Sequence, residues 1–439
     1  MKYYSTNKQI KNKSFKDVLF EGLAPDGGLY MPENFPLLSG SFLDDLANKT
    51  FSEIALEVGK LFIDDIPEKD LKEIITGAFS PEVFTDCGDG FPTPLVKISE
   101  NIFVEELWHG PTLAFKDFGA RFMSRAMGYF LKQGNKELKI IVATSGDTGS
   151  AVAAGFYNVP NIKVYILYPS GKVSDLQEKQ LTTFGGNITA IEVNGVFDDC
   201  QKLAKQILGD SELNGKGEFS SANSINFGRL LPQMFYYFFG YGQLIKMGIK
   251  DISFCIPSGN FGNLTAGLMS KRMGLPVSRF IAATNINDVV PEYLHSGVYK
   301  PRNSQKTMSN AMDVGNPSNF ARMLDLYQGD AKLMANDIIG ISVSEEETAQ
   351  TIKSVYSDAG YLLDTHSAVA VKAAKESGSK DPIISLSTAH PVKFNDVIEP
   401  IIGKKIEIPE KLKEIINKEK KSILIENDLE ALKQILREY

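Results

Sequence analysis

Short, unbroken apolar runs alternate with helix-like segments through most of this chain. Strands that are buried on both faces read as continuous apolar runs, and parallel strands need a crossover connection, which is usually a helix. The alternation therefore predicts α/β folding, with parallel sheets covered by helices on both faces. The clearest runs are residues 138–143, 162–167, 188–193, 252–256, 280–283 and 383–386, and helical patterning follows at 150–157, from 174 onward, at 197–208 and at 264–273.

The 439 residues are too many for one compact core and predict two or three domains. Residues 1–95 carry mixed helical patterning broken by prolines, so we expect a separate, largely helical N-terminal unit. Two α/β domains should follow, at 96–255 and 256–439. The charged segment from Glu407 onward is predicted to be solvated helix.

Composition excludes several classes of protein. A net charge of −7 argues against a nucleic-acid partner, which requires a basic face. No apolar run approaches the roughly 18 residues of a membrane span, and no secretory signal opens the chain. The three cysteines, Cys87, Cys200 and Cys255, have neither metal-ligand nor redox spacing. We therefore expect a cytoplasmic protein without a metal, present as a monomer or homodimer.

Lys116 stands where the turn-forming stretch 109–115 runs into a helix, since apolar residues follow at helical spacing from Phe118 to Ala126. The positive end of the helix dipole disfavours a second positive charge, and flanking Phe115 and Phe118 should desolvate the amine. Both effects lower the pKa of a lysine. A neutral amine is what Schiff-base chemistry with an aldehyde requires.

Two glycine-containing loops, 145–149 and 258–263, each connect an apolar run to a helix. Such loops lie beyond the carboxyl ends of parallel strands, where amides at a helix N-terminus bind anions. Neither loop has the glycine spacing of a dinucleotide fold or of a P-loop. Taken alone, each loop is either an anion site or an ordinary turn between a strand and a helix.

Five motifs together resemble the threonine synthases of the enterobacterial and yeast branch, which are pyridoxal-phosphate enzymes of the tryptophan-synthase-β type. The resemblance covers nearly the whole chain. It implies two α/β domains that enclose pyridoxal 5'-phosphate, preceded by an extra N-terminal unit. The motifs are Gly-Leu-Ala-Pro-Asp-Gly-Gly-Leu-Tyr at 22–30, His-Gly-Pro-Thr-Leu-Ala-Phe-Lys-Asp at 109–117, and the segments 143–149, 257–263 and 387–391.

The resemblance assigns cofactor contacts. It implies that Lys116 forms the Schiff base and acts as the catalytic base. Thr388 would face the pyridine nitrogen, whereas without the motif a threonine after a strand is best read as a helix cap. The loop that holds the cofactor phosphate would comprise Gly259, Asn260, Phe261, Gly262 and Asn263.

Substrate contacts are implied in the same way. The first loop would grip the substrate carboxylate, with Asp147 near the Schiff base where related families carry an asparagine. A leaving phosphate needs cationic donors; we expect Arg229 and Lys393 to serve, supported by Asn226 and Ser224, and expect Arg121 to form a surface salt bridge. Within the first loop, the expected substrate contacts are Ser145, Gly146, Asp147 and Thr148.

The activity implied is a carbon–oxygen lyase reaction of threonine biosynthesis. O-phospho-L-homoserine and water would give L-threonine and phosphate by γ-elimination and β-addition. The alternatives are a serine/threonine dehydratase or cysteine synthase of the same fold, a dinucleotide oxidoreductase, and a phosphate-binding relative without catalytic activity. The sequence gives no role to the four histidines, His109, His295, His366 and His390.

Overall fold

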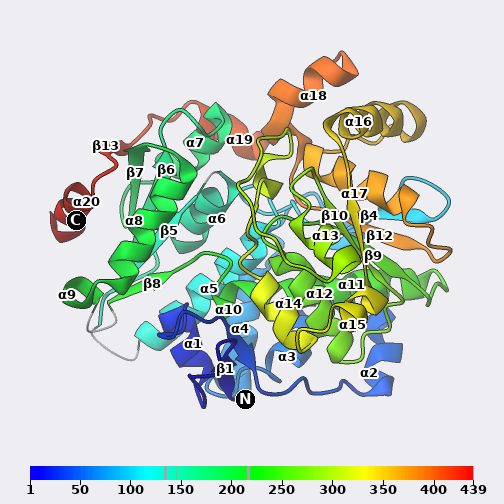
Figure 1. The fold of residues 1–439 in the computed structure, drawn as a ribbon, viewed down its shortest axis with the longest axis horizontal. Helices are drawn as coiled ribbons and strands as arrows, with labels where there is room; N and C mark the ends of the chain where they lie inside the picture. Colours follow the sequence, from blue (N-terminus) through cyan, green and yellow to red (C-terminus); the bar gives the residue numbers. More distant parts are fainter. Residues whose placement is uncertain (133–135, 145, 215–217, 439) are drawn as a thin grey trace.

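The computed structural model describes residues 1–132, 136–144, 146–214 and 218–438. Two sheets, each covered by helices, lie side by side, and the N-terminal segment packs beneath them in the view of Figure 1. The fold class predicted from the alternating apolar runs is confirmed. None of the described helices combines the length and the apolar character that crossing a membrane requires.

The six-stranded sheet has the order β11-β10-β9-β12-β4-β3, and only the β3–β4 pair is antiparallel. Ile383 of β12 lies opposite Ile102 of β4 and Ser253 of β9, so the carboxyl ends of β9 and β12 are neighbours. The strands are β3 (Leu95–Lys97), β4 (Ile102–Glu106), β9 (Ser253–Pro257), β10 (Phe280–Thr284), β11 (Ile338–Ser342) and β12 (Ile383–Ser387).

The five-stranded sheet is parallel throughout and has the order β13-β7-β6-β5-β8. The apolar core on one of its faces combines strand residues with residues of α8 and α20. The strands are β5 (Leu138–Ala143), β6 (Ile162–Pro169), β7 (Ile188–Asn194), β8 (Phe219–Ser221) and β13 (Ser422–Glu426), and the helices are α6 (Asp147–Phe156), α7 (Asp175–Thr182), α8 (Phe197–Gly209), α9 (Ser211–Asn214) and α20 (Leu429–Glu438).

The remaining helices surround the six-stranded sheet or join the two halves (Figure 1). They are α5 (Lys116–Leu131), α10 (Phe227–Leu230), α11 (Gln233–Lys246), α12 (Gly262–Arg272), α13 (Val289–Ser296), α14 (Phe320–Leu326), α15 (Ala331–Asp337), α16 (Glu345–Ala359), α17 (Thr365–Glu376), α18 (Asn395–Ile402) and α19 (Glu410–Ile416), with short 3-10 turns η3 (Asn310–Met312) and η4 (Pro391–Phe394).

The N-terminal unit is largely helical, as expected. An aromatic cluster fastens it to the body: the ring of Phe118 on α5 lies 4.8 Å from that of Phe84, 5.5 Å from Phe79 and 5.7 Å from Phe51. Its elements are β1 (Tyr3–Ser5), α1 (Phe15–Glu21), β2 (Tyr30–Pro32), α2 (Gly40–Asp44), η1 (Leu46–Asn48), α3 (Phe51–Gly59), α4 (Glu68–Ala78) and η2 (Gly88–Gly90).

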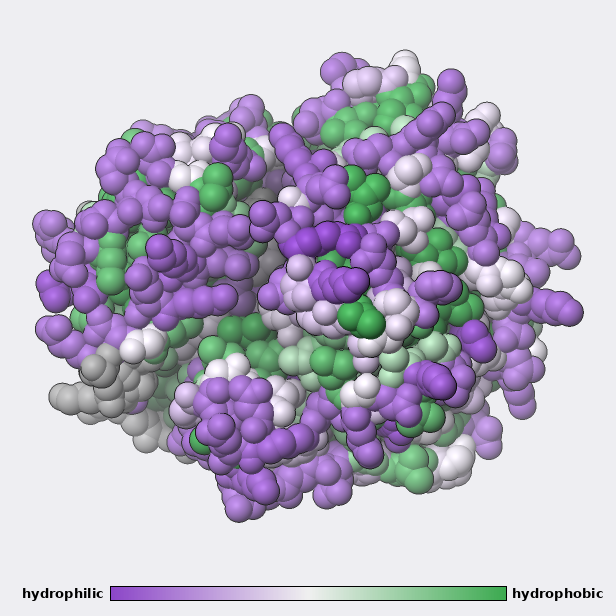
Figure 2. Space-filling view, in the orientation of Figure 1, coloured by the Kyte–Doolittle hydropathy of each residue, from purple (hydrophilic) through white to green (hydrophobic). Residues whose placement is uncertain are grey.

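The two sheets exchange segments of the chain. Strand β4 precedes Lys116 in sequence yet lies in the six-stranded sheet, and β13 returns from the C-terminal part to the five-stranded sheet. The expectation of solvated helix from Glu407 onward is wrong for Ser422–Glu426, because this segment pairs with β7 and forms an edge strand of the five-stranded sheet. Figure 2 shows mainly hydrophilic surfaces on both halves and a hollow between them.

Candidate active site

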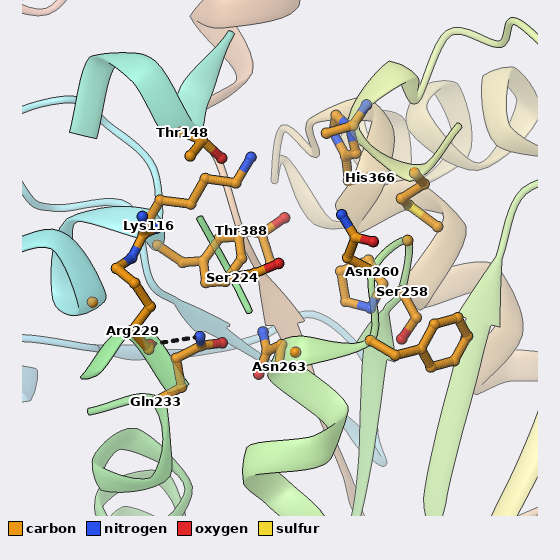
Figure 3. A pocket seen from close by; sticks show the side chains of 18 residues that line it. Lys116, Thr148, Ser224, Arg229, Gln233, Ser258, Asn260, Asn263, His366 and Thr388 are labelled. Carbon is orange, nitrogen blue, oxygen red and sulfur yellow. Dashed lines mark hydrogen bonds between the residues drawn. The ribbon is translucent and has the colours of Figure 1, made fainter. Parts of the chain in front are cut away.

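A pocket lies where the carboxyl ends of β9 and β12 meet the start of α5. Lys116 and Thr148 stand on one side of it, and Ser258, Asn260 and His366 stand on the other (Figure 3). The pocket therefore lies between the two sheets. Its lining is Phe115, Lys116, Gly119, Thr148, Ser224, Arg229, Gln233, Pro257, Ser258, Gly259, Asn260, Phe261, Gly262, Asn263, Ala311, Met312, His366 and Thr388.

Lys116 is the first residue of α5, and backbone bonds hold it beside Thr388. The amide of Phe115 donates to the Thr388 carbonyl at 2.9 Å, and Ala114 forms a bridge with Ala389. Burial lowers the pKa of Lys116; Asp147 opposes this shift, and Lys393 adds to it. Desolvation by Phe115 was expected and fits, since that ring lines the pocket, whereas Phe118 faces the N-terminal unit.

The turn before α12 is built to receive an anion. Phe261 has a left-handed backbone with φ of 59°, and α12 begins at the next residue, so its amino end faces the pocket. Gly259 is needed for a different reason. A Cβ there would lie 2.8 Å from the carbonyl oxygen of Ala311 and from the Cα of Met312. This glycine lets the segment containing η3 close one wall of the pocket.

Two lining residues carry buried donors that have no hydrogen-bond partner among the residues that the structure describes. The Asn263 side-chain oxygen accepts from the hydroxyls of Tyr236 and Tyr237, both at 2.8 Å. This fixes the amide so that its nitrogen, which has no partner, faces the pocket (Figure 3). The Nε of Arg229 is likewise unpartnered. Because unsatisfied buried donors are costly, the pocket is suited to an anionic ligand.

Arg229 and Ser224 line the pocket, as expected for substrate contacts, but Asn226 does not. The Asn226 oxygen caps α10 by accepting from the Gly228 amide at 2.8 Å, and its nitrogen donates to the carbonyls of Leu19 and Ser221. Both polar groups of the Asn226 side chain therefore form hydrogen bonds to the backbone of this protein. Burial lowers the pKa of Arg229 to about 10, which still leaves the side chain charged at neutral pH.

Asp147 and Lys393 form a buried ion pair behind Thr148. The two charged groups lie 2.7 Å apart, the amide of Gln177 donates to Asp147 at 2.9 Å, and Lys393 also donates to the Thr112 carbonyl. Burial alone would raise the pKa of Asp147, but Lys393 and Lys116 outweigh it and hold the pKa below its usual range.

The other members of the first loop lie at the start of α6. Gly146 is its N-cap and packs against Gln177, where a Cβ would lie 2.7 Å from the side-chain nitrogen. Thr148 lines the pocket. Ser145 lies outside the described residues. Of this loop, Thr148 therefore faces the pocket directly, and Asp147 supports it from behind.

Thr388 lines the pocket and is not the helix cap that a threonine after a strand would suggest. The cap of η4 is His390, whose Nδ1 accepts from the Val392 amide at 3.1 Å.

Arg121 also departs from expectation. It is buried rather than in a surface salt bridge, and its Nε donates to the Ala78 carbonyl at 2.9 Å.

Sequence reasoning missed His366. Its Nδ1 lies 2.9 Å from the carboxylate of Asp364, and its Nε2 accepts from the Ala311 amide at 3.2 Å. Since an amide only donates, Nε2 carries no proton, and Nδ1 donates to the carboxylate. His366 thus anchors the wall that Gly259 touches. Asp364 before a helix is visible in the sequence as an N-cap, but its distant partner loop is not.

Comparison with known proteins agrees with this geometry. Family models match the chain for "Pyridoxal-phosphate dependent enzyme" over residues 88–388, for "Threonine synthase N terminus" over 2–79, and for "Threonine synthase, C-terminal" over 367–436. The chain belongs to the threonine synthase family. The chain is therefore a member of a pyridoxal-phosphate-dependent enzyme family, and the resemblance of its motifs is confirmed.

Individual members of the family match from end to end. Threonine synthase of Escherichia coli is 40% identical, covering 99% of both chains. Threonine synthase of Saccharomyces cerevisiae is 36% identical, covering 99% of this chain and 97% of its own. The solved structure of threonine synthase from Brucella melitensis with bound pyridoxal phosphate has a TM-score of 0.93 at 36% identity, covering 100% and 99% of the two chains.

The pocket fits this cofactor. Lys116 offers an amine of lowered pKa for the aldehyde, and the free amide of Asn263 beside the amino end of α12 offers donors for the phosphate. The hydroxyl of Thr388 is available for the ring nitrogen. These groups come from the start of α5, the start of α12 and the end of β12. The fit of the pocket to the cofactor therefore depends on how these helices are placed against the six-stranded sheet.

Proposed function

We propose that this chain converts O-phospho-L-homoserine and water to L-threonine and phosphate, the last step of threonine biosynthesis, with Lys116 holding the cofactor. The observation that carries the proposal is the placement of the Lys116 amine in one pocket with the unpartnered donors of Asn263 and Arg229. The pocket thus offers an amine for the cofactor and two separate hydrogen-bond donors for anions. This set matches a reaction in which both the cofactor and the substrate carry phosphate.

Lys116 would both hold the cofactor and move protons. When bound, pyridoxal phosphate supplies an aldehyde that binds amines and a ring that accepts the electron pair left when a carbon loses a proton. The Lys116 amine, which lines the pocket, would take a proton from Cα of the substrate and act again at Cβ. A lowered pKa keeps a fraction of this amine unprotonated, which a base requires.

The substrate ends would be held by different elements. Thr148 and the amino end of α6 are suited to the carboxylate. Arg229, with its free Nε, is suited to the phosphate that leaves from Cγ, and Ser224 adds a hydroxyl. Phe115 and Met312 cover apolar parts of the pocket and would exclude water from the reacting carbons.

Asp147 and Lys393 would act from behind the substrate loop. We propose that Asp147 supports the positive charge at Lys116 by proximity and that Lys393 acts chiefly through Asp147, with which it is paired. Direct contact of Lys393 with the substrate phosphate would need this ion pair to open. Asn226 would support the segment 221–229 through the contacts of its amide rather than by touching substrate.

We also propose that the protein acts in the cytoplasm as a monomer or homodimer and does not bind nucleic acid. The net charge of −7 supports the last point, and three free, buried cysteines support a reducing compartment. We retain residues 1–95, 96–255 and 256–439 as the main parts of three proposed domains. Strand β4 crosses into the six-stranded sheet, β13 crosses into the five-stranded sheet, and β9 spans the second boundary. Light scattering of the purified protein would test the assembly.

The function is tested by adding O-phospho-L-homoserine to the purified protein with pyridoxal phosphate. Equal amounts of phosphate and threonine should appear. Serine and threonine serve as alternative substrates. Formation of a keto acid and ammonia from these, without turnover of phosphohomoserine, would instead support the dehydratase alternative. If the protein binds the cofactor but turns over none of these substrates, the result would support the alternative of a relative without catalytic activity.

A further inference from the structure

Arg322 is a completely buried cation on α14, directly behind the turn before α12. All of its hydrogen-bond partners are neutral oxygens. Its Nε donates to the carbonyl of Tyr30 at 3.1 Å, and Nη2 donates to the carbonyl of Ile225 at 2.7 Å. Its Nη1 donates to the side-chain oxygen of Asn319 at 2.6 Å and to the carbonyl of Ser224 at 3.4 Å.

The charge of Arg322 has no counter-ion among the described residues, none of which forms an ion pair with it. Burial lowers its pKa to about 9, so the guanidinium stays protonated at neutral pH. An uncompensated charge in a protein interior is strongly destabilising unless an opposite charge lies nearby. Ser224, which Arg322 contacts, lines the pocket, so a bound anion in the pocket could supply that opposite charge.

Asn319 connects Arg322 to the turn. Arg322 donates to the side-chain oxygen of Asn319, so the amide nitrogen of Asn319 faces the other way. This nitrogen is buried and has no hydrogen-bond partner in the part of the chain that the structure describes. A Cβ built on Gly262 would lie 3.3 Å from that nitrogen. The backbone amide of Asn319 also donates to the carbonyl of Asn260 at 3.3 Å. The free amide is therefore directed at the first residue of α12.

We propose that Arg322 is a positioning residue for the anion held at the α12 turn, and that Asn319 is a further donor to it. The inference rests on the proposed function in one respect, namely that the anion is the phosphate of the cofactor. Arg322 orients the Asn319 amide and places a buried positive charge behind the turn. Through Tyr30 it also joins the N-terminal motif 22–30 to the cofactor site, which gives that motif a role.

The test compares two ligands that differ only in the phosphate. Apo-protein is titrated with pyridoxal phosphate and with pyridoxal, and each Kd is read from the change in absorbance. Wild type should prefer the phosphorylated ligand strongly. Arg322→Met and Asn319→Ala should each reduce this preference about tenfold or more, since one buried hydrogen bond to a charged group is worth that much. Both should change the affinity for pyridoxal much less.

Arg121→Met is the matched control. Arg121 is also a buried arginine that bonds to backbone carbonyls of the N-terminal unit, at Ala78 and Gly77, but it does not line the pocket. The control should keep the wild-type ratio of the two Kd values even if its melting temperature falls. If Arg322→Met does not fold, Arg322→Gln, which also removes the charge, and Asn319→Ala carry the test.

A wild-type ratio in Asn319→Ala and in the folded Arg322 variant would overturn the inference. Equal loss of affinity for both ligands would overturn it too, since that indicates general damage to the pocket. If wild type itself does not prefer pyridoxal phosphate over pyridoxal, the turn does not hold the cofactor phosphate, and the inference also fails. Failure of the proposed function is a separate result: the ratios respond as expected, but phosphohomoserine yields no threonine.

Discussion

The ammonium of Lys393 lies 2.7 Å from the carboxylate of Asp147, and neither side chain is appreciably exposed to solvent. Lys393 comes from the turn after β12, and Asp147 comes from the first turn of α6, so the pair joins the two sheets behind Lys116. A buried pair of this kind stabilises its own geometry but is sensitive to the loss of either partner.

Breaking the pair from one side should destabilise the protein. We expect Lys393→Met to lower the free energy of unfolding by about 3–5 kcal/mol, because it leaves Asp147 buried and unpaired. The double variant Asp147→Asn/Lys393→Met should lose less than the sum of the two single losses. Urea unfolding of all four proteins measures the coupling. Additive losses would show that the two groups act independently.

The stability of the protein at acid pH should also depend on the Asp147–Lys393 pair. The pKa of Asp147 in the folded protein lies below its usual value, so the folded state holds this carboxylate ionised while the unfolded chain takes up a proton below about pH 4. This stabilisation is present at neutral pH and is lost as pH falls toward the folded pKa. In Lys393→Met the loss between pH 5 and pH 3 should be smaller, because burial then raises the Asp147 pKa. Parallel stability curves for wild type and variant would contradict this assignment.

Lys116 should be the residue that reacts with the cofactor. Borohydride reduction of the loaded protein, followed by peptide mapping, should place the label on Lys116; label on another lysine would refute the assignment. Lys116→Ala should reduce kcat/KM at least about 100-fold, the lower range for loss of a proton-transfer group. Its melting temperature should change little, because the amine has no hydrogen bond or ion pair that other described residues depend on.

Arg229 should distinguish substrates with a phosphate from those without one. We expect Arg229→Leu to raise KM for phosphohomoserine at least about tenfold, because a charged hydrogen bond to phosphate is lost. Any deamination of serine should fall much less. Arg121→Leu provides the control, as it removes a buried arginine that lies outside the pocket. If Arg229→Leu weakens both reactions equally, Arg229 supports the fold instead of the leaving group.

A glycine should be required at position 259, because the wall of the pocket formed by Ala311 and Met312 lies against it. In Gly259→Ala the new Cβ would lie 2.8 Å from backbone atoms of Ala311 and Met312, which cannot rotate away. We expect a stability loss of about 1–3 kcal/mol, typical of overpacking, together with weaker cofactor binding. Thermal melting with and without pyridoxal phosphate measures both effects. Gly40→Ala, where no atom lies within 4 Å, should be neutral. A Gly259→Ala protein as stable as this control would show that the wall can move freely.

Sequence patterns predicted the buried strands well where apolar residues predominate. All six runs are strands; β9 is shifted by one residue, and β6, β7, β10 and β12 extend one or two residues beyond the carboxyl ends of their runs. Strand β4 was missed because it contains Glu105 and Glu106, which are both buried. Their partners, the hydroxyls of Thr93 and Tyr361, come from other segments and permit this burial. Strand β13 was missed because charged residues surround it and because it is an edge strand, which pairs with one neighbour, β7, among the described strands.

The sequence by itself determined the parts of the site that depend on local backbone. The start of α5 at Lys116 and the glycine-containing turn before α12 follow from short motifs, because capping and turn formation involve neighbouring residues. Only the tertiary structure decided which side chains reach the pocket. It directs Arg229 and His366 to the pocket, pairs Lys393 with Asp147, and places Asn319 and Arg322 behind the turn before α12. The physical reason is that burial and pairing depend on segments distant in sequence, whose contacts exist only after the two sheets pack together.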